Sequence, residues 1–188
     1  MIPVAFLDAN VLYRATTRSV LIYLALAGVC SVRWSDVVQD EWTRNLVKNR
    51  PDLNPQRIAG TRSLMDAKIP DAIVTGYEPL ITTLTLPDPN DRHVTAAVIH
   101  ARATVIVTEN LSDFPEAALA PFSIVAQPPD YFVCALIESE PLTALAAFAR
   151  DRASMNNPPM TVDAYLAALE HSGLVATANV LRRFVDQL

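Results

Sequence analysis

Two stretches decide the fold of this chain: Asp88-Pro89-Asn90-Asp91-Arg92-His93-Val94 and Thr104-Val105-Ile106-Val107-Thr108-Glu109-Asn110-Leu111-Ser112-Asp113-Phe114. The second opens with a β-branched apolar run, which predicts a buried strand over residues 104–108. The first contains a Pro- and Asn-rich turn that leads into a helical pattern. Each places carboxylates in a loop beside an apolar element. We therefore expect the loops at these junctions to carry the chemistry of the protein.

The sequence around them alternates between strand and helix patterns. Strands are predicted at residues 2–7, 31–35, 81–86, 104–108 and 122–126. Helices are predicted at residues 10–28, at 36–50 with Asp36 as N-cap, at 55–68 with Asn54 as N-cap, and at 92–101, whereas residues 69–80 are predicted as loop. This alternation predicts an α/β fold with a doubly wound, mostly parallel central sheet flanked by helices.

The pattern changes after Pro128. Residues 131–138, 142–150 and 162–188 all have helical periodicity, with breaks at Pro141 and at Pro158-Pro159. We therefore divide the chain into an α/β domain over residues 1–126 and a helical C-terminal extension over residues 127–188. The extension is expected to pack on the domain or to form a partner interface.

The amino-acid composition is typical of a globular protein. About half of the 188 residues are apolar (51%), which is enough for one sizeable core. Cys30 and Cys134 lie in apolar runs without metal-site or disulfide spacing, so we expect buried thiols in a reducing compartment. The N-terminus lacks the basic region of a secretory signal and no run is long enough to span a membrane, so the expected location is the cytoplasm.

Charge and glycine content bear on possible ligands. The net charge of −5 argues mildly against a polyanion, although bound divalent cations and local arginines would offset it. The four glycines form neither G-x-G-x-x-G nor G-K-[ST], which argues against dinucleotide and nucleoside-triphosphate binding.

Carboxylates follow several of the predicted strands. Asp8, Asp91 and Asp113 each lie at or just beyond a predicted carboxyl end, and these ends share one edge of a parallel sheet. Glu41, one turn into the next helix, could add a fourth carboxylate. Gathered carboxylates raise one another's pKa unless a hard cation neutralises them, and oxygen ligands without His or Cys favour Mg²⁺ or Mn²⁺.

Each acidic residue also has a purely structural interpretation. Asp8 could cap the first helix, and Glu41 could pair with Arg44 or Lys48 on a solvated face. Asp88, Asn90 and Asp113 are also typical turn residues. His93 and His100 have no partner at metal-ligand spacing, so a core or surface role is expected for both.

The motifs together resemble a PIN domain. The resemblance rests on Leu7-Asp8-Ala9-Asn10-Val11-Leu12, on Glu41 and on residues 88–97 and 106–115, and it covers about residues 1–126. It is nearest to the branch that includes VapC-type toxins of bacterial toxin–antitoxin pairs. The resemblance implies a PIN-like fold, a Mg²⁺- or Mn²⁺-dependent endoribonuclease acting on RNA, a cognate antitoxin protein as partner, and a homodimer.

The resemblance also implies site residues. The family's acidic quartet, expected to be both catalytic and metal-binding, falls on Asp8, Glu41, Asp91 and Asp113. We expect supporting roles for Asn10, Asp88, Thr108 and Asn110. Substrate contacts are expected for the basic residues that flank the site in the sequence, which are Arg14, Arg18, Arg44, Lys48 and Arg92. One departure is Asn110, which stands where many members have Asp, so Asp113 must supply the fourth acid or the second metal position is weak. Each basic residue alone could equally belong to a solvated helix face.

Two alternatives to a nuclease remain open. A phosphatase of the haloacid dehalogenase type also keeps an Asp after its first strand, but such enzymes have a D-x-D motif, whereas this chain reads Asp8-Ala9-Asn10. The other alternative is a non-catalytic PIN-like binding module, in which the acidic pocket receives arginines of a partner.

Overall fold

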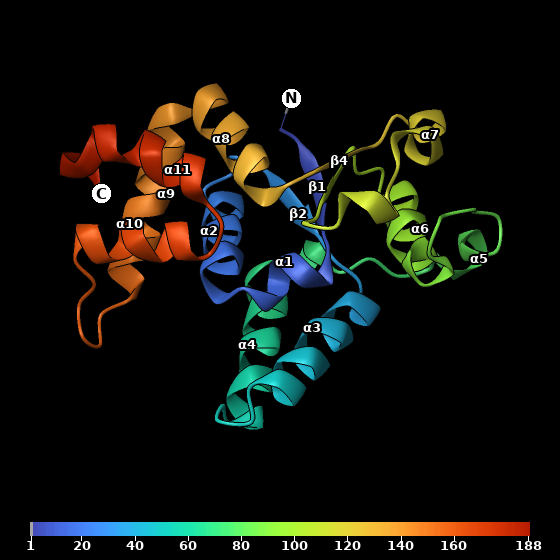
Figure 1. Cartoon of the computed structure of the whole chain (residues 1–188), viewed down its shortest axis with the longest axis horizontal. Coiled ribbons are helices and arrows are strands. Elements are labelled where there is room, and N and C mark those ends of the chain that lie inside the picture. The colour runs from blue at the N-terminus through green and yellow to red at the C-terminus, as the bar shows by residue number, and fades with distance from the viewer. Residues whose placement is uncertain (1) are drawn as a thin grey trace.

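The computed structural model describes residues 2–188 and has a parallel sheet at its centre (Figure 1). The strand order is β2-β1-β3-β4, with β1 at Val4–Leu7, β2 at Ser31–Arg33, β3 at Val105–Val107 and β4 at Val125–Gln127. Ala5 pairs with Val32 on one side and with Val105 on the other. Side chains of β1 and β3 are buried except for the partly buried Val4, as expected for inner strands of a parallel sheet.

Helices cover the sheet and extend beyond it. The N-terminal part contains α1 (Ala9–Tyr13), α2 (Ala15–Leu26), α3 (Asp36–Asn49), α4 (Pro55–Lys68), α5 (Glu78–Ile81), α6 (Arg92–His100) and α7 (Glu116–Leu119). The C-terminal part contains α8 (Pro129–Ser139), α9 (Pro141–Ser154), α10 (Val162–His171) and α11 (Val175–Leu181). Residues 2–188 also contain five short 3-10 helices, η1 to η5, at Pro70–Ala72, Pro89–Asp91, Leu111–Asp113, Ala120–Phe122 and Arg182–Gln187. The predicted α/β class with a parallel sheet and flanking helices is confirmed.

One predicted strand is wrong. Residues 81–86 contain the end of α5 and then a coil rather than a strand. The hydroxyl groups of Thr82 and Thr83 donate to the nearby carbonyls of Pro79 and Leu80, and Leu84 is buried in the core. The alternating pattern is therefore satisfied by local threonine hydrogen bonds and buried leucines, not by a sheet partner.

Several element boundaries also differ from the prediction. Ser35, not Asp36, caps α3, because its hydroxyl accepts from the Val38 amide at 3.3 Å. The predicted helix over residues 10–28 is divided at Arg14, whose backbone is extended, and the last strand begins at Val125. The predicted helix over residues 162–188 is interrupted at Gly173, which has a φ of +88°. By contrast, α4 with its Asn54 cap has the bounds predicted.

The C-terminal helices pack against α2, and α2 and α9 lie side by side (Figure 1). Asp151 of α9 is fully buried at this junction and accepts hydrogen bonds from Ser19 of α2 and from Tyr165 of α10, the latter at 2.6 Å. A further bond joins Thr17 of α2 to the carbonyl of Ser172. Among the described residues, no helix is long and apolar enough to cross a membrane.

Candidate active site

Asp8 lies at the end of β1 and caps α1. One carboxylate oxygen accepts from the Ala9 amide at 2.7 Å, and the other accepts from the Asn10 side chain at 2.6 Å and from the Thr108 hydroxyl at 2.7 Å. Burial raises the pKa of Asp8, while the hydrogen bonds from Thr108 and Ala9 oppose this rise. Asp8 is thus a helix cap and also a buried carboxylate at the carboxyl edge of the sheet.

Thr108 and Asn10 join the loops after β1 and β3. Thr108 is fully buried, and its hydroxyl also accepts from the Asn10 side chain and from the Asn110 amide, both at 3.0 Å. The Asn10 carbonyl oxygen accepts from the Glu109 amide at 3.1 Å. This network fixes the orientation of Asp8.

Asp91 reaches the same edge by a route that the sequence did not predict. No strand precedes it, and it ends η2, whose first turn is capped by Asp88 through a 2.8 Å bond from the Asn90 amide. Partial burial, then the negative charges of Asp113, Asp8 and Asp88, raise the pKa of Asp91 to about 6. The carboxylates of different loops therefore interact across the site.

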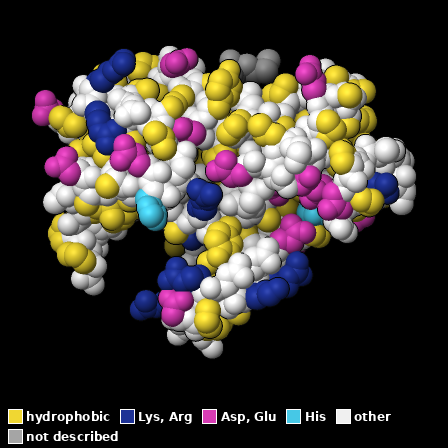
Figure 2. Space-filling model, viewed as in Figure 1, with side chains coloured by type: hydrophobic (Ala, Val, Ile, Leu, Met, Phe, Trp, Pro, Cys, Tyr) yellow, Lys and Arg dark blue, Asp and Glu magenta, His cyan; other side chains and the backbone are white. Residues whose placement is uncertain are grey.

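An open cleft of about 590 Å³ lies at this edge of the sheet. Its walls are Asp8, Ala9, Asn10, Tyr13, Arg14, Glu41, Arg44, Asn45, Asn49, Asp91, Asn110 and Asp113. The predicted acidic quartet is thus brought together at one place. Figure 2 shows acidic side chains gathered beside the basic surface of α3 and α4.

Glu41 is held by a residue to which sequence analysis gave no site role. His93 of α6 is buried, and its Nε2 lies 3.3 Å from Oε1 of Glu41. Its Nδ1 is buried without a hydrogen-bond partner among the described residues. Of the core and surface roles left open for His93, the structure shows the buried one. The contact with Glu41 was missed, and the signal for it in the sequence is that His93 stands two residues after Asp91.

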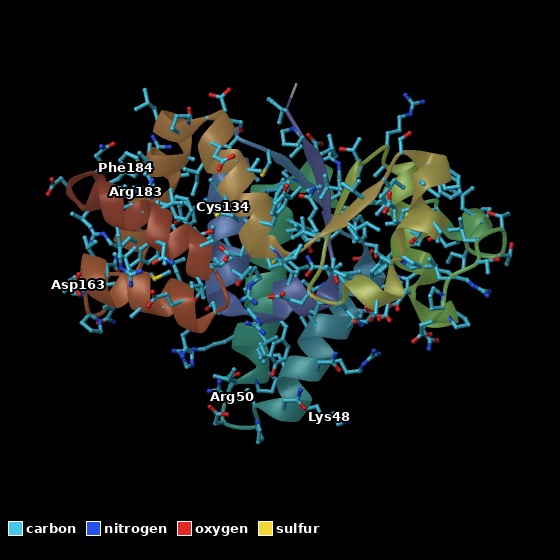
Figure 3. All side chains as sticks on the ribbon, turned by 45° about the horizontal axis from the view of Figure 1, so that its top comes forward. Lys48, Arg50, Cys134, Asp163, Arg183 and Phe184 are labelled. Carbon is cyan, nitrogen blue, oxygen red and sulfur yellow. The ribbon has the colours of Figure 1, made fainter. Side chains whose placement is uncertain are left out.

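Asn110 and some of the predicted basic residues line the cleft, whereas the other basic residues do not. Asn110 lines it and donates a hydrogen bond to Asp113, so it supports the acid three residues later. Arg14 and Arg44 line the cleft as well. Lys48, near the end of α3 (Figure 3), and the half-buried Arg92 lie outside its lining, as do Thr108 and Asp88.

The donor set is of the type that hard cations prefer, since it consists of carboxylate and amide oxygens. Within residues 2–188, however, no three His, Cys, Asp or Glu side chains lie close enough together to hold a metal ion. The chemistry of the donors fits Mg²⁺ or Mn²⁺, while the arrangement is more open than a coordination shell.

The parallel sheet and the acidic cleft at its carboxyl edge define an α/β protein of PIN type. Comparison with known proteins agrees: residues 129–183 match the family model "VapC50 C-terminal domain", and a 98-residue stretch is 37% identical to "Putative ribonuclease VapC50" of Mycobacterium tuberculosis. The chain is thus similar to VapC-type proteins over these parts of its length. The aligned stretch covers 52% of this chain and 57% of that relative's length, and no solved structure matches. The match to the family model lies in the C-terminal extension, for which the sequence motifs predicted no site residues.

Proposed function

We propose that this protein is a metal-dependent endoribonuclease that hydrolyses RNA phosphodiester bonds, as the toxin of a toxin–antitoxin pair. The observation that carries the proposal is the gathering of Asp8, Glu41, Asp91 and Asp113 around one cleft. Burial and, after it, the negative charges of neighbouring carboxylates raise the pKa of Asp91, and a divalent cation would relieve the repulsion between these charges. The name of the M. tuberculosis relative supports the activity.

Within this proposal the residues have distinct tasks. Asp8 and Asp91 would hold the principal cation, and Glu41 and Asp113 would hold a second cation or orient the attacking water. A cation at this site supplies Lewis acidity toward the phosphoryl oxygens and a more acidic water. Thr108 and Asn10 keep Asp8 oriented, and His93 keeps Glu41 at the cleft. The expected products carry a 5′-phosphate and a 3′-hydroxyl.

The test is cleavage of a mixed pool of structured and single-stranded RNAs with Mg²⁺, Mn²⁺ or EDTA. Asp91→Asn should lower the cleavage rate by about 100-fold or more, because it replaces a negatively charged cation ligand by a neutral amide. The matched control is Asp163→Asn, the same chemical change at an exposed position on the C-terminal helices (Figure 3), and it should cleave like the unchanged protein.

Cleavage that persists in EDTA, or that Asp91→Asn leaves intact, would contradict the proposal. No cleavage with any metal would favour the non-catalytic binding module. The antitoxin partner and the homodimer stay predictions; co-purification with the protein encoded beside it and sedimentation of the purified chain would test them.

A further inference from the structure

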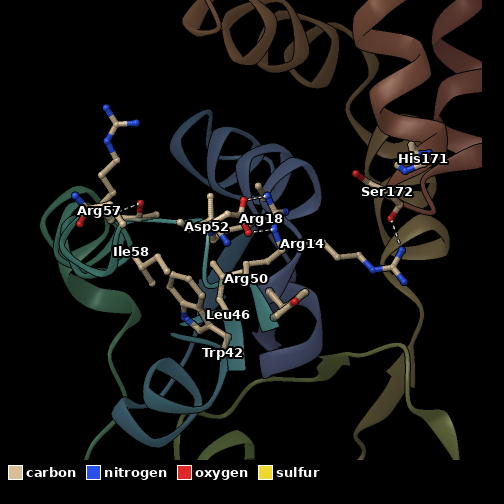
Figure 4. A pocket seen from close by; sticks show the side chains of 15 residues that line it. Arg14, Arg18, Trp42, Leu46, Arg50, Asp52, Arg57, Ile58, His171 and Ser172 are labelled. Atoms are coloured by element: carbon tan, nitrogen blue, oxygen red, sulfur yellow. Dashed lines mark hydrogen bonds and ion pairs between the residues drawn. The ribbon is translucent and has the colours of Figure 1, made fainter. Parts of the chain in front are cut away.

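A second groove continues from the acidic cleft. It has a volume of about 810 Å³ and is lined by residues of α1 to α4 together with His171 and Ser172 of the C-terminal part (Figure 4). Tyr13 and Arg14 line both cavities. The groove and the cleft therefore form one continuous surface.

The groove has the opposite charge to the cleft. Its lining contains Arg14, Arg18, Arg50 and Arg57, and the one carboxylate among its lining residues is Asp52. An extended ligand along both cavities would meet four carboxylates at one end and several guanidinium groups at the other.

Two of the four arginines are already engaged. Arg50 forms a bidentate pair with Asp52 at 2.8 and 2.6 Å, and Arg18 bonds the Leu12 carbonyl while its guanidinium lies 4.7 Å from the ring centre of Trp42. Arg57 is exposed and makes no side-chain hydrogen bond or ion pair with any described residue. Arg14 is exposed and uses Nη1 for one bond, leaving other N–H donors for a ligand.

The turn between α10 and α11 forms one wall of the groove. Arg14 donates to the Ser172 carbonyl at 2.9 Å, and this bond is drawn across the groove in Figure 4. The next residue is Gly173, where an added Cβ would lie 3.0 Å from Nη1 of Arg14 in a backbone conformation with positive φ. The positive φ at this position favours glycine, and the C-terminal helices help to shape the groove.

We propose that a single RNA strand, continuing from the scissile phosphate, lies in this groove with its phosphates on Arg14 and Arg57 and a base against Tyr13. The inference rests on the proposed function. The cavity volume of about 810 Å³ accommodates a few nucleotides of one strand. Guanidinium groups with free donors and an aromatic ring are the elements of single-strand recognition. An acidic peptide fits less well, because it has no base to lie against Tyr13.

The test uses an Asp91→Asn background in EDTA, so that binding is measured without cleavage. The probe is a fluorescein-labelled single-stranded RNA of about ten nucleotides and mixed sequence, and anisotropy gives Kd across a salt series. Arg57→Glu should weaken binding about tenfold or more and reduce the slope of log K against log salt by about 0.7. Its matched control, Arg183→Glu, introduces the same charge change on an exposed residue outside the groove (Figure 3) and should change Kd by less than about twofold.

A second variant, Gly173→Ala, tests the wall and should weaken binding while the circular-dichroism spectrum stays the same. Equal losses of RNA affinity in Arg57→Glu and Arg183→Glu would show an effect of net charge and would overturn the inference. Unchanged RNA affinity in Arg57→Glu would also overturn it. Displacement of the RNA by a polyglutamate peptide at lower concentration than by unlabelled RNA would overturn it in favour of an acidic protein segment. A Kd that depends on Arg57 in a protein that cleaves no RNA would overturn the proposed function alone.

Discussion

Asp91 carries an electrostatic cost when it is ionised, because burial and neighbouring carboxylates raise its pKa to about 6. At pH values below 3.8, the ordinary pKa of an Asp side chain, the carboxyl group is protonated in both the folded and the unfolded chain. Between 3.8 and about 6 the unfolded chain releases the proton first, so folding stability falls, and the full penalty is present above about 6. Because the side chain is only half-buried, solvent screening reduces this penalty to about 1 kcal/mol.

Asp91→Asn should therefore raise the free energy of unfolding by about 1 kcal/mol near pH 7 in EDTA, and the gain should vanish near pH 4. Urea denaturation at both pH values measures it. Asp163→Asn is the control and should give no such pH-dependent gain. An equal gain at both pH values would show that the charge of Asp91 is not the cause.

At the scale of elements, α11 depends on a cap supplied by another helix. Asp130 of α8 accepts from the amides of Ala176 and Thr177 at 2.8 and 2.9 Å and from the Thr177 hydroxyl at 2.7 Å. Free amides at a helix start need such acceptors. Asp130→Ala should thus lower the free energy of unfolding by about 1–3 kcal/mol in urea denaturation.

Glu138→Ala is the matched control for that change. Glu138 is an exposed carboxylate on the same helix, α8, and makes no side-chain bond with the described residues. It should change stability by less than about 0.5 kcal/mol. Similar losses in both variants would mean that the cap contributes nothing measurable.

At the scale of the whole molecule, the buried carboxyl of Asp151 links the N-terminal and C-terminal parts. It joins Ser19 of α2 to Tyr165 of α10, and burial raises its pKa. Tyr165→Phe removes one donor from a buried acceptor, so it should cost about 1–3 kcal/mol, measured by thermal or urea unfolding. Because the two parts share this junction, unfolding should stay a single transition.

Tyr131→Phe provides the comparison for this loss, since Tyr131 is 64% exposed and the same hydroxyl is removed there. It should leave stability unchanged within about 0.5 kcal/mol. No loss of stability in Tyr165→Phe, or an equal loss in Tyr131→Phe, would contradict a stabilising role of the Asp151 junction.

The sequence by itself determined the parallel sheet and the neighbourhood of the acidic residues. Buried parallel strands are continuous apolar runs, and residues 104–108 have that local signature. Asp8 and Asp113 follow such strands, so their meeting at one edge could be predicted from chain order. Asn54 and Pro55 likewise determined the start of α4, because caps act through local hydrogen bonds.

Only the tertiary structure decided what depends on contacts between distant segments. The pattern of residues 81–86 suits a strand, yet no strand forms there, so Asp91 reaches the site through η2 instead. The contact of His93 with Glu41 joins α6 to α3, and the bond from Arg14 to Ser172 spans 158 residues. Periodicity and capping report the preferences of a few neighbouring residues, whereas these contacts arise from how whole elements pack, which is why they became visible only in the folded chain.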